Sequence, residues 1–90
     1  MKPPRELTPV EEEFVTTLVS ALPPVIARKE ASRYLGGVIA SQTLSNADSA
    51  GEGPAVAYRV GRAVTYRTEA LVRWIVSRYG VIRIESIKTL

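Results

Sequence analysis

The side chains that could do chemistry in this sequence are amides, hydroxyls and arginines. Four small polar residues cluster in one short stretch: Gln42, Thr43, Ser45 and Asn46. A glutamine or asparagine side chain can form two hydrogen bonds with the edge of adenine in the major groove. The guanidinium of Arg62 suits a phosphate or the negative potential of a narrow minor groove. Because small polar residues also solvate an ordinary short helix, the surrounding elements must decide between the two interpretations.

The sequence lacks most of the residue types that carry out catalysis or bind metal ions. The chain contains no cysteine and no histidine, which removes thiolate nucleophiles, the commonest general base and the commonest metal ligand. Asp48 and Glu52 form a carboxylate pair, but a loop between two elements explains both of them. We therefore expect no enzyme, no metal site and no cofactor.

Length and composition predict one domain over residues 1–90, with a flexible start at 1–7 and a tail or short strand at 81–90. Hydrophobic residues make up 46% of the chain, which is enough for a modest core. No apolar run approaches the roughly 18 residues of a membrane span. The first residues also lack the apolar stretch of a signal peptide. These features favour a cytoplasmic protein without a membrane partner.

Positive charge is unevenly distributed. The net charge is +3, most of the twelve basic residues are arginines, and an acidic run at Glu11–Glu13 makes the first part of the chain negative. Residues 28–90 are correspondingly basic. This excess favours a polyanion partner without establishing one. The acidic run has a simpler explanation, because the first turn of a helix favours negative charge.

Two helices are expected in the first part of the chain. Thr8 and Glu11 form a capping-box pattern, and an apolar stripe predicts a helix from Pro9 to Leu22. A second helix is expected from about Arg28 to Leu35, where Gly36-Gly37 ends it.

Two more helices are expected further along. Ser41 is a candidate cap for a short polar helix over about Gln42–Ala47. Thr68 is a candidate cap for a helix over about Glu69–Tyr79, whose apolar stripe includes Trp74 as a core residue.

Alternating residues predict a hairpin from Ala55–Val60 and Ala63–Arg67. Placing Val60 opposite Val64 gathers the apolar side chains on one face, because directly opposed residues share a face. That pairing requires a three-residue loop, Gly61-Arg62-Ala63.

This register predicts the direction of the hairpin side chains. Tyr58 and Tyr66 face inward, whereas Arg59 and Arg67 face away from the apolar side towards phosphate. Arg62 lies at the tip, where it has no core role. The candidate DNA contacts are then Lys29, Arg33, Ser41, Gln42, Thr43, Ser45, Asn46, Arg59, Gly61, Arg62 and Arg67.

The order of elements is that of a winged helix-turn-helix. We expect an α+β, mainly helical fold with a two-stranded β-hairpin wing and an extra N-terminal helix. In this arrangement the short polar helix enters the major groove and the arginine-tipped hairpin enters the minor groove.

Five segments within residues 25–78 also resemble the excisionase group of the MerR-like winged-helix superfamily. They are Arg28–Gly36 (RKEASRYLG), Ser41–Leu44 (SQTL), Gly51–Pro54 (GEGP), Tyr58–Arg67 (YRVGRAVTYR) and Leu71–Ile75 (LVRWI). Two features depart from the family pattern: Ala27 stands where a serine or threonine usually caps the second helix, and the helix over Pro9–Leu22 lies outside the family core.

The resemblance implies a recombination directionality factor. Such a protein binds and bends double-stranded attachment-site DNA, directs a site-specific integrase towards excision of a mobile element, and often binds side by side with further copies of itself. The family also includes small AlpA-like transcriptional regulators, which use the same contacts. A protein-interaction adaptor built on a winged helix is the alternative from another class.

Overall fold

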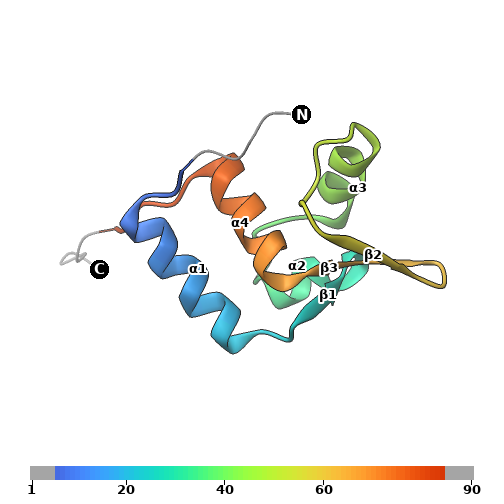
Figure 1. Cartoon of the computed structure of the whole chain (residues 1–90), viewed down its shortest axis with the longest axis horizontal. Helices are drawn as coiled ribbons and strands as arrows, with labels where there is room; N and C mark the ends of the chain where they lie inside the picture. The colour runs from blue at the N-terminus through green and yellow to red at the C-terminus, as the bar shows by residue number, and fades with distance from the viewer. Residues whose placement is uncertain (1–5, 85–90) are drawn as a thin grey trace.

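The structure is a computed structural model, and it describes residues 6–84. Four α-helices, one 3-10 turn and a three-stranded antiparallel sheet make these residues a small α+β fold, compatible with a winged helix. Figure 1 shows α3 and the β2–β3 hairpin at one end of the molecule, α1 at the other and α4 between them. The predictions for residues 1–5 and 85–90 lie outside the described residues.

Helix α1 spans Pro9–Ala21 and begins as its sequence predicts. The Thr8 hydroxyl accepts a hydrogen bond from the Glu11 amide at 3.2 Å, and the Glu11 carboxylate accepts one from the Thr8 amide at 2.9 Å. This reciprocal pair is the capping box, which satisfies two amides that the helix itself cannot. The stripe of α1 packs on the core through the fully buried Val15.

The second helical segment is shorter and less regular than expected. A 3-10 turn, η1, spans Arg28–Glu30, and α2 covers only Ala31–Tyr34. Ala27 offers no side-chain cap, so the first turn tightens into i→i+3 bonds instead of starting an α-helix. Gly36 and Gly37, with φ of 65° and 83°, end the segment as predicted.

A strand that the sequence did not predict completes the sheet. Strand β1 covers Val25–Ala27 and pairs with β3, so the strand order is β1-β3-β2. The expected hairpin of two strands forms, but it belongs to a sheet with a third strand. Prolines at 23 and 24 end α1 and hold the chain extended, which lets Ile26 lie opposite Tyr66 in the core.

The hairpin forms in a different register from the predicted one. Strand β2 spans Ala57–Val60, strand β3 spans Ala63–Arg67, and Val60 pairs with Ala63 rather than Val64. The loop therefore has two residues, Gly61 and Arg62. Gly61 has a φ of 62°, as at the first central position of a type II′ turn, whose twist matches that of the flanking strands.

The shifted register reverses the direction of half the hairpin side chains. Tyr66 is fully buried as predicted, but Tyr58 and Val60 point outward and are 45% and 64% exposed. The prediction that Tyr58 faces the core is wrong, since a one-residue slip moves a side chain to the other face.

Helices α3 (Ser41–Ser49) and α4 (Thr68–Tyr79) have the expected positions but not the expected caps. Neither Ser41 nor Thr68 caps its helix. The Ser41 hydroxyl donates to the Arg28 carbonyl at 3.2 Å, and the buried Thr68 hydroxyl donates to the Pro23 carbonyl. The two hydroxyls thus hold α3 against η1 and α4 against the segment between α1 and β1.

One hydrophobic core connects the helices to the sheet. Trp74, expected in this core, is only half-buried, and its indole N–H donates to the Glu52 carbonyl at 2.7 Å. The core residues with no more than 2% exposure are Val15, Ile26, Ala31, Leu44, Tyr66, Leu71, Val72 and Val76.

Candidate nucleic-acid interface

Helix α3 presents its two amide side chains on one exposed face. Leu44 is fully buried and Ala47 is 5% exposed, which fixes the opposite face of the helix against the core. Gln42 and Asn46 are both exposed, and the Gln42 amide nitrogen donates to the Asn46 side-chain oxygen at 2.9 Å. Residues four apart are neighbours on a helix. The bond therefore holds the two amides together while leaving each with free donors or acceptors.

The remaining polar candidates on α3 are less accessible. Ser41, Thr43 and Ser45 are all half-buried. The hydroxyl of Ser41 is bonded to the backbone of η1. The accessible polar surface of α3 is therefore narrower than the sequence predicts. It consists mainly of the side chains of Gln42 and Asn46.

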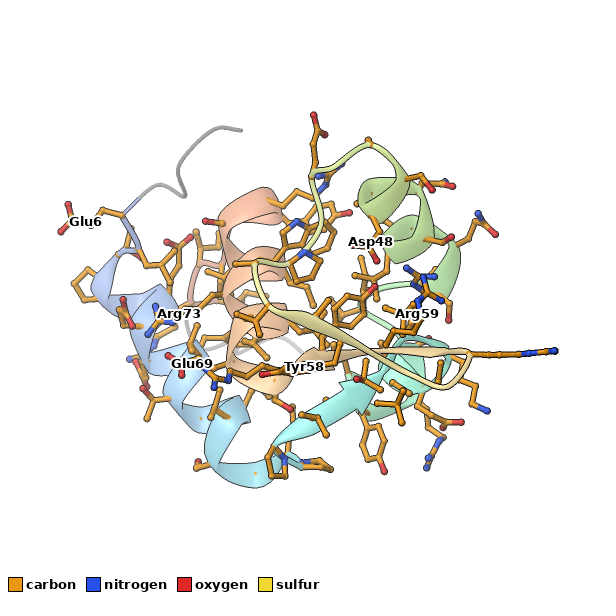
Figure 2. The ribbon with its side chains drawn as sticks, turned by 45° about the vertical axis from the view of Figure 1, so that its right-hand side comes forward. Glu6, Asp48, Tyr58, Arg59, Glu69 and Arg73 are labelled. Carbon is orange, nitrogen blue, oxygen red and sulfur yellow. The ribbon has the colours of Figure 1, made fainter. Side chains whose placement is uncertain are left out.

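The hairpin carries three arginines in three different directions. Arg62 is exposed in the turn. Arg59 pairs with Val64 and shares a face with Tyr66, which contacts α3, so Arg59 lies on the side of the hairpin that faces α3 (Figure 2). Arg67 pairs with Val25 on the opposite face. The prediction that Arg59 and Arg67 share a face is wrong, because the two-residue loop shifts the register by one.

Most cations around this surface are unpaired within residues 6–84. Lys29, Arg59, Arg62 and Arg67 are exposed, and none contacts a carboxylate in that part of the chain. Arg33 differs from them.

Arg33 is partly neutralised by its neighbours. It forms an ion pair with Glu30 at 2.7 Å, and its guanidinium lies 4.7 Å from the centre of the Tyr34 ring. The hydrogen bond from Arg33 to Glu30 raises the pKa of Arg33. Arg33 is therefore a weaker DNA-contact candidate than Lys29 on the same segment.

A polar cluster that sequence reasoning missed joins α3 to the sheet. Arg28 donates from Nε to the Tyr66 hydroxyl at 3.0 Å and from Nη2 to the Asp48 carboxylate at 2.5 Å. The Tyr66 hydroxyl donates to the same carboxylate oxygen at 2.5 Å. We call these three residues the Arg28–Asp48–Tyr66 network.

Burial and hydrogen bonding raise the pKa values of two members of this network. Burial raises the pKa of Tyr66 to about 12, and its hydrogen bond to Asp48 adds to the effect. The hydrogen bonds with Tyr66 and then Asp48 raise the pKa of Arg28. One feature of the sequence points to the network: a buried tyrosine hydroxyl must find a partner, and Tyr66 was expected to face inward.

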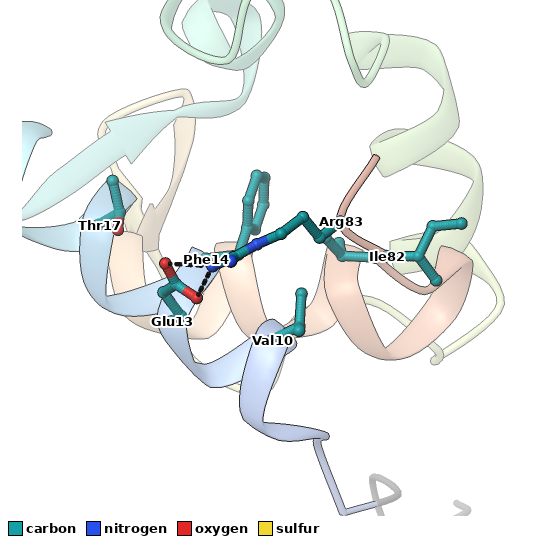
Figure 3. Close-up of a pocket in the computed structure, with 7 residues that line it drawn as sticks. Val10, Glu13, Phe14, Thr17, Ile82 and Arg83 are labelled. Atoms are coloured by element: carbon teal, nitrogen blue, oxygen red, sulfur yellow. Dashed lines mark hydrogen bonds and ion pairs between the residues drawn. The ribbon is translucent and has the colours of Figure 1, made fainter. Parts of the chain in front are cut away.

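The other end of the molecule has an open groove of about 210 Å³ (Figure 3). Its lining includes Val10 and Phe14 of α1 and Ile82 of the following segment. Arg83 crosses it to form an ion pair with Glu13 at 2.8 Å. Because the two charged side chains of the groove neutralise each other, we place the candidate site at α3 and the hairpin instead.

Residues 6–84 contain neither a metal-ligand cluster nor a membrane-spanning helix. That part of the chain contains no group of three or more acidic residues placed to hold a metal ion. It also contains no helix with the length and apolar character needed to span a bilayer.

Comparison with known proteins returns no similar family model, no similar curated protein and no similar solved structure. The functional proposal therefore depends on the geometry of α3 and the hairpin and on the residues themselves.

Proposed function

We propose that this chain is a sequence-specific double-stranded DNA-binding protein with winged helix-turn-helix architecture. The observation that carries the proposal is the placement of two exposed amides on α3 at the same end of the molecule as the unpaired arginines of the hairpin. The amides are suited to contacts with base edges, and the arginines are suited to contacts with phosphates. A protein that binds DNA needs both within reach of one duplex.

In this proposal α3 enters the major groove with Gln42 and Asn46 facing the base edges. The buried Leu44 anchors the helix from behind, so the amides meet the bases from a rigid element. Each amide can form a bidentate contact with adenine. The hydrogen bond between them limits their rotamers and lowers the entropy cost of binding.

The hairpin acts as the wing. Arg62 at its exposed tip inserts into the minor groove, where a narrow A·T-rich segment attracts arginine. Arg59, on the side facing α3, contacts the phosphates between the two grooves. Lys29 and Arg67 contact phosphates at the flanks.

The more specific form of the proposal is an excisionase-type architectural factor. It rests on the resemblance of residues 25–78 to that group. In this form several copies bind adjacent sites, bend the attachment-site DNA and favour integrase-mediated excision. A small transcriptional regulator would use the same contacts on a single site, and a protein-interaction adaptor would not need them.

The test is a mobility titration with a duplex that spans the attachment site and promoter nearest the gene, at low and high salt. A ladder of cooperative complexes that weakens with salt and with Arg62→Ala supports the excisionase-type factor. A single saturating complex with the same sensitivity supports DNA binding but overturns the excisionase form in favour of a regulator. Absence of any salt-sensitive complex overturns DNA binding, because phosphate contacts make affinity fall steeply with salt.

A further inference from the structure

We infer that the Arg28–Asp48–Tyr66 network is a positioning device that sets α3 relative to the hairpin and thereby determines how well the protein distinguishes one DNA sequence from another. The inference rests on the proposed DNA-binding function. It assigns a role to three residues that need not touch DNA themselves.

The network connects three elements that lie far apart in the sequence. Arg28 belongs to η1, Asp48 to α3 and Tyr66 to β3. One carboxylate oxygen of Asp48 accepts from both Arg28 and Tyr66 at 2.5 Å. A single atom on α3 is thus held from two directions, which restrains both its distance from the sheet and its rotation.

The position of Asp48 is restrained on its other side as well. A Cβ added at Gly53 would overlap the second carboxylate oxygen of Asp48. Gly53 lies in the loop that connects α3 to the hairpin. The loop therefore packs directly against the carboxylate, and the absence of a side chain at position 53 is what leaves room for it.

The charges of the network suit positioning rather than DNA attraction. Arg28 and Asp48 form an ion pair with about a quarter of each side chain exposed, at 26% and 23%. Their opposite charges cancel, so the network adds little to the long-range attraction of phosphates. An unpaired aspartate on α3 would instead repel the DNA backbone, and Arg28 prevents this.

Base contacts and phosphate contacts differ in their need for such a device. Bidentate recognition of a base edge requires atoms to be placed within about 0.5 Å. Attraction of arginines to phosphates tolerates larger displacements, because electrostatic forces act over about 10 Å at moderate salt. Loosening the network should therefore reduce sequence discrimination while leaving non-specific affinity nearly unchanged.

The experiment compares Tyr66→Phe with the wild-type protein. This change removes one hydroxyl from the network, keeps the buried ring and leaves the net charge unaltered. Tyr79→Phe is the matched control, because Tyr79 is 56% exposed on α4 and packs edge-on against Trp74 through its ring. The probes are a duplex selected by the wild-type protein from a random-sequence pool and a shuffled duplex of the same composition.

The measured quantity is the ratio of affinities for the selected and shuffled duplexes. We expect Tyr66→Phe to lower this ratio about tenfold, the equivalent of one lost bidentate base contact, and to change affinity for the shuffled duplex less than about twofold. Tyr79→Phe should keep the wild-type ratio. Gly53→Ala, which displaces the Asp48 carboxylate without removing a polar group, should lower the ratio as Tyr66→Phe does.

Each outcome has a distinct meaning when circular dichroism shows that the variants are folded. An unchanged ratio in folded Tyr66→Phe and Gly53→Ala, with wild-type protein that discriminates, overturns the positioning role and leaves the proposed function intact. Equal losses for both duplexes also overturn it, because they indicate a general loss of binding. Wild-type protein that selects no duplex and shows no salt-sensitive binding overturns the proposed function, and the inference with it.

Discussion

The arginines at the two ends of the molecule differ in what they contact. At the α1–α4 end, Arg73 bonds both carboxylate oxygens of Glu12, at 3.1 and 3.2 Å, and one of Glu69 at 3.0 Å (Figure 2). Arg83 bonds Glu13 at the same end. The acidic residues at the start of α1 therefore have two roles. They interact favourably with the helix dipole, and they neutralise arginines from α4 and from the segment after it.

The hairpin end has the opposite character. Residues 55–67 contain three arginines and no acidic residue. The nearby carboxylate of Asp48 is already held by Arg28. Folding thus pairs Glu12 and Glu13 of α1 with Arg73 and Arg83, and it leaves the three hairpin arginines without a carboxylate partner in residues 6–84. A modest net charge can therefore conceal a concentrated positive surface, and pairing reveals that surface better than composition does.

The first prediction tests this difference with two double variants that lower the net charge equally. Arg59→Ala/Arg62→Ala should weaken binding to a random-sequence duplex about 100-fold and reduce the salt slope by about 2, because two positive charges that displace counterions from the DNA are lost, Arg59 at the phosphates and Arg62 in the minor groove. Arg73→Ala/Arg83→Ala should weaken it less than about threefold. Fluorescence anisotropy titrations over a range of salt concentrations measure both quantities. Equal losses in the two variants would show that net charge, not its placement, drives binding.

The second prediction concerns stability, for which we expect the larger effect at the α1–α4 end and the smaller effect at the hairpin. Glu11 is 3% exposed, and its carboxylate accepts hydrogen bonds from the backbone amides of Thr8 and Val81. Glu11→Ala should lower the free energy of unfolding by about 2 kcal/mol, because it removes the capping box and leaves amides without an acceptor. Arg62→Ala should change it by less than about 0.5 kcal/mol. Urea unfolding followed by circular dichroism provides the measurement.

Glu11→Gln is the control for the second prediction. A glutamine keeps one acceptor oxygen and can still complete the capping box with the Thr8 amide, but its NH2 group cannot accept from the Val81 amide. It should therefore recover about half of the lost stability. A Glu11→Gln variant as unstable as Glu11→Ala would mean that the negative charge of Glu11, rather than its hydrogen bonds, supports the end of α1.

Local patterns explain why part of the fold could be predicted from the sequence. The capping box at Thr8 and Glu11 and the break at Gly36-Gly37 involve residues close together in the chain. Their effects do not depend on distant packing. The same holds for the exposed amide face of α3, because one turn of helix determines it.

Elements that depend on distant partners could not be predicted. Strand β1 has three residues, too few to show an alternating pattern, and it exists because β3 pairs with it. The hairpin register was predicted from the rule that apolar residues share a buried face. That rule failed because the hairpin projects from the core, which leaves Tyr58 and Val60 exposed, and the geometry of the two-residue turn determines the pairing.

The Arg28–Asp48–Tyr66 network was missed for a related reason. Its hydrogen bonds join residues 38, 20 and 18 positions apart. No local spacing indicates such contacts. The candidate site was consequently predicted as a set of exposed side chains without the residues that hold them in place.

The third prediction concerns base recognition at the α3 surface. Gln42→Ala should reduce the preference at one base pair about tenfold, within the range for a bidentate contact, and should lower non-specific affinity less. Ser49→Ala is the control, because Ser49 is exposed at the far end of the same helix. Selection of duplexes from a random pool, followed by sequencing, measures the preference. An unchanged preference would show that another residue contacts the bases.

The last prediction concerns the loss of stability at alkaline pH, which should differ between the two ends of the molecule. Burial raises the pKa of Tyr66 from 10.0 to about 12, so the folded protein holds this proton more tightly than the unfolded chain does. The resulting stabilisation is complete below about pH 10 and is lost as pH rises from about 10 to about 12. Urea unfolding over this range should show a steeper fall for wild-type protein than for Tyr66→Phe.

Tyr79→Phe, measured in parallel, should keep the wild-type slope. The ion pairs of Arg73 and Arg83 contain no phenol, so the excess alkaline loss should begin at the α3–hairpin end, where hydrogen exchange can locate it. A slope that Tyr66→Phe leaves unchanged would mean that burial and the hydrogen bond to Asp48 do not hold this proton more tightly in the folded protein. The alkaline loss of stability would then have no source in the Tyr66 phenol, and the two ends of the molecule would respond to high pH alike.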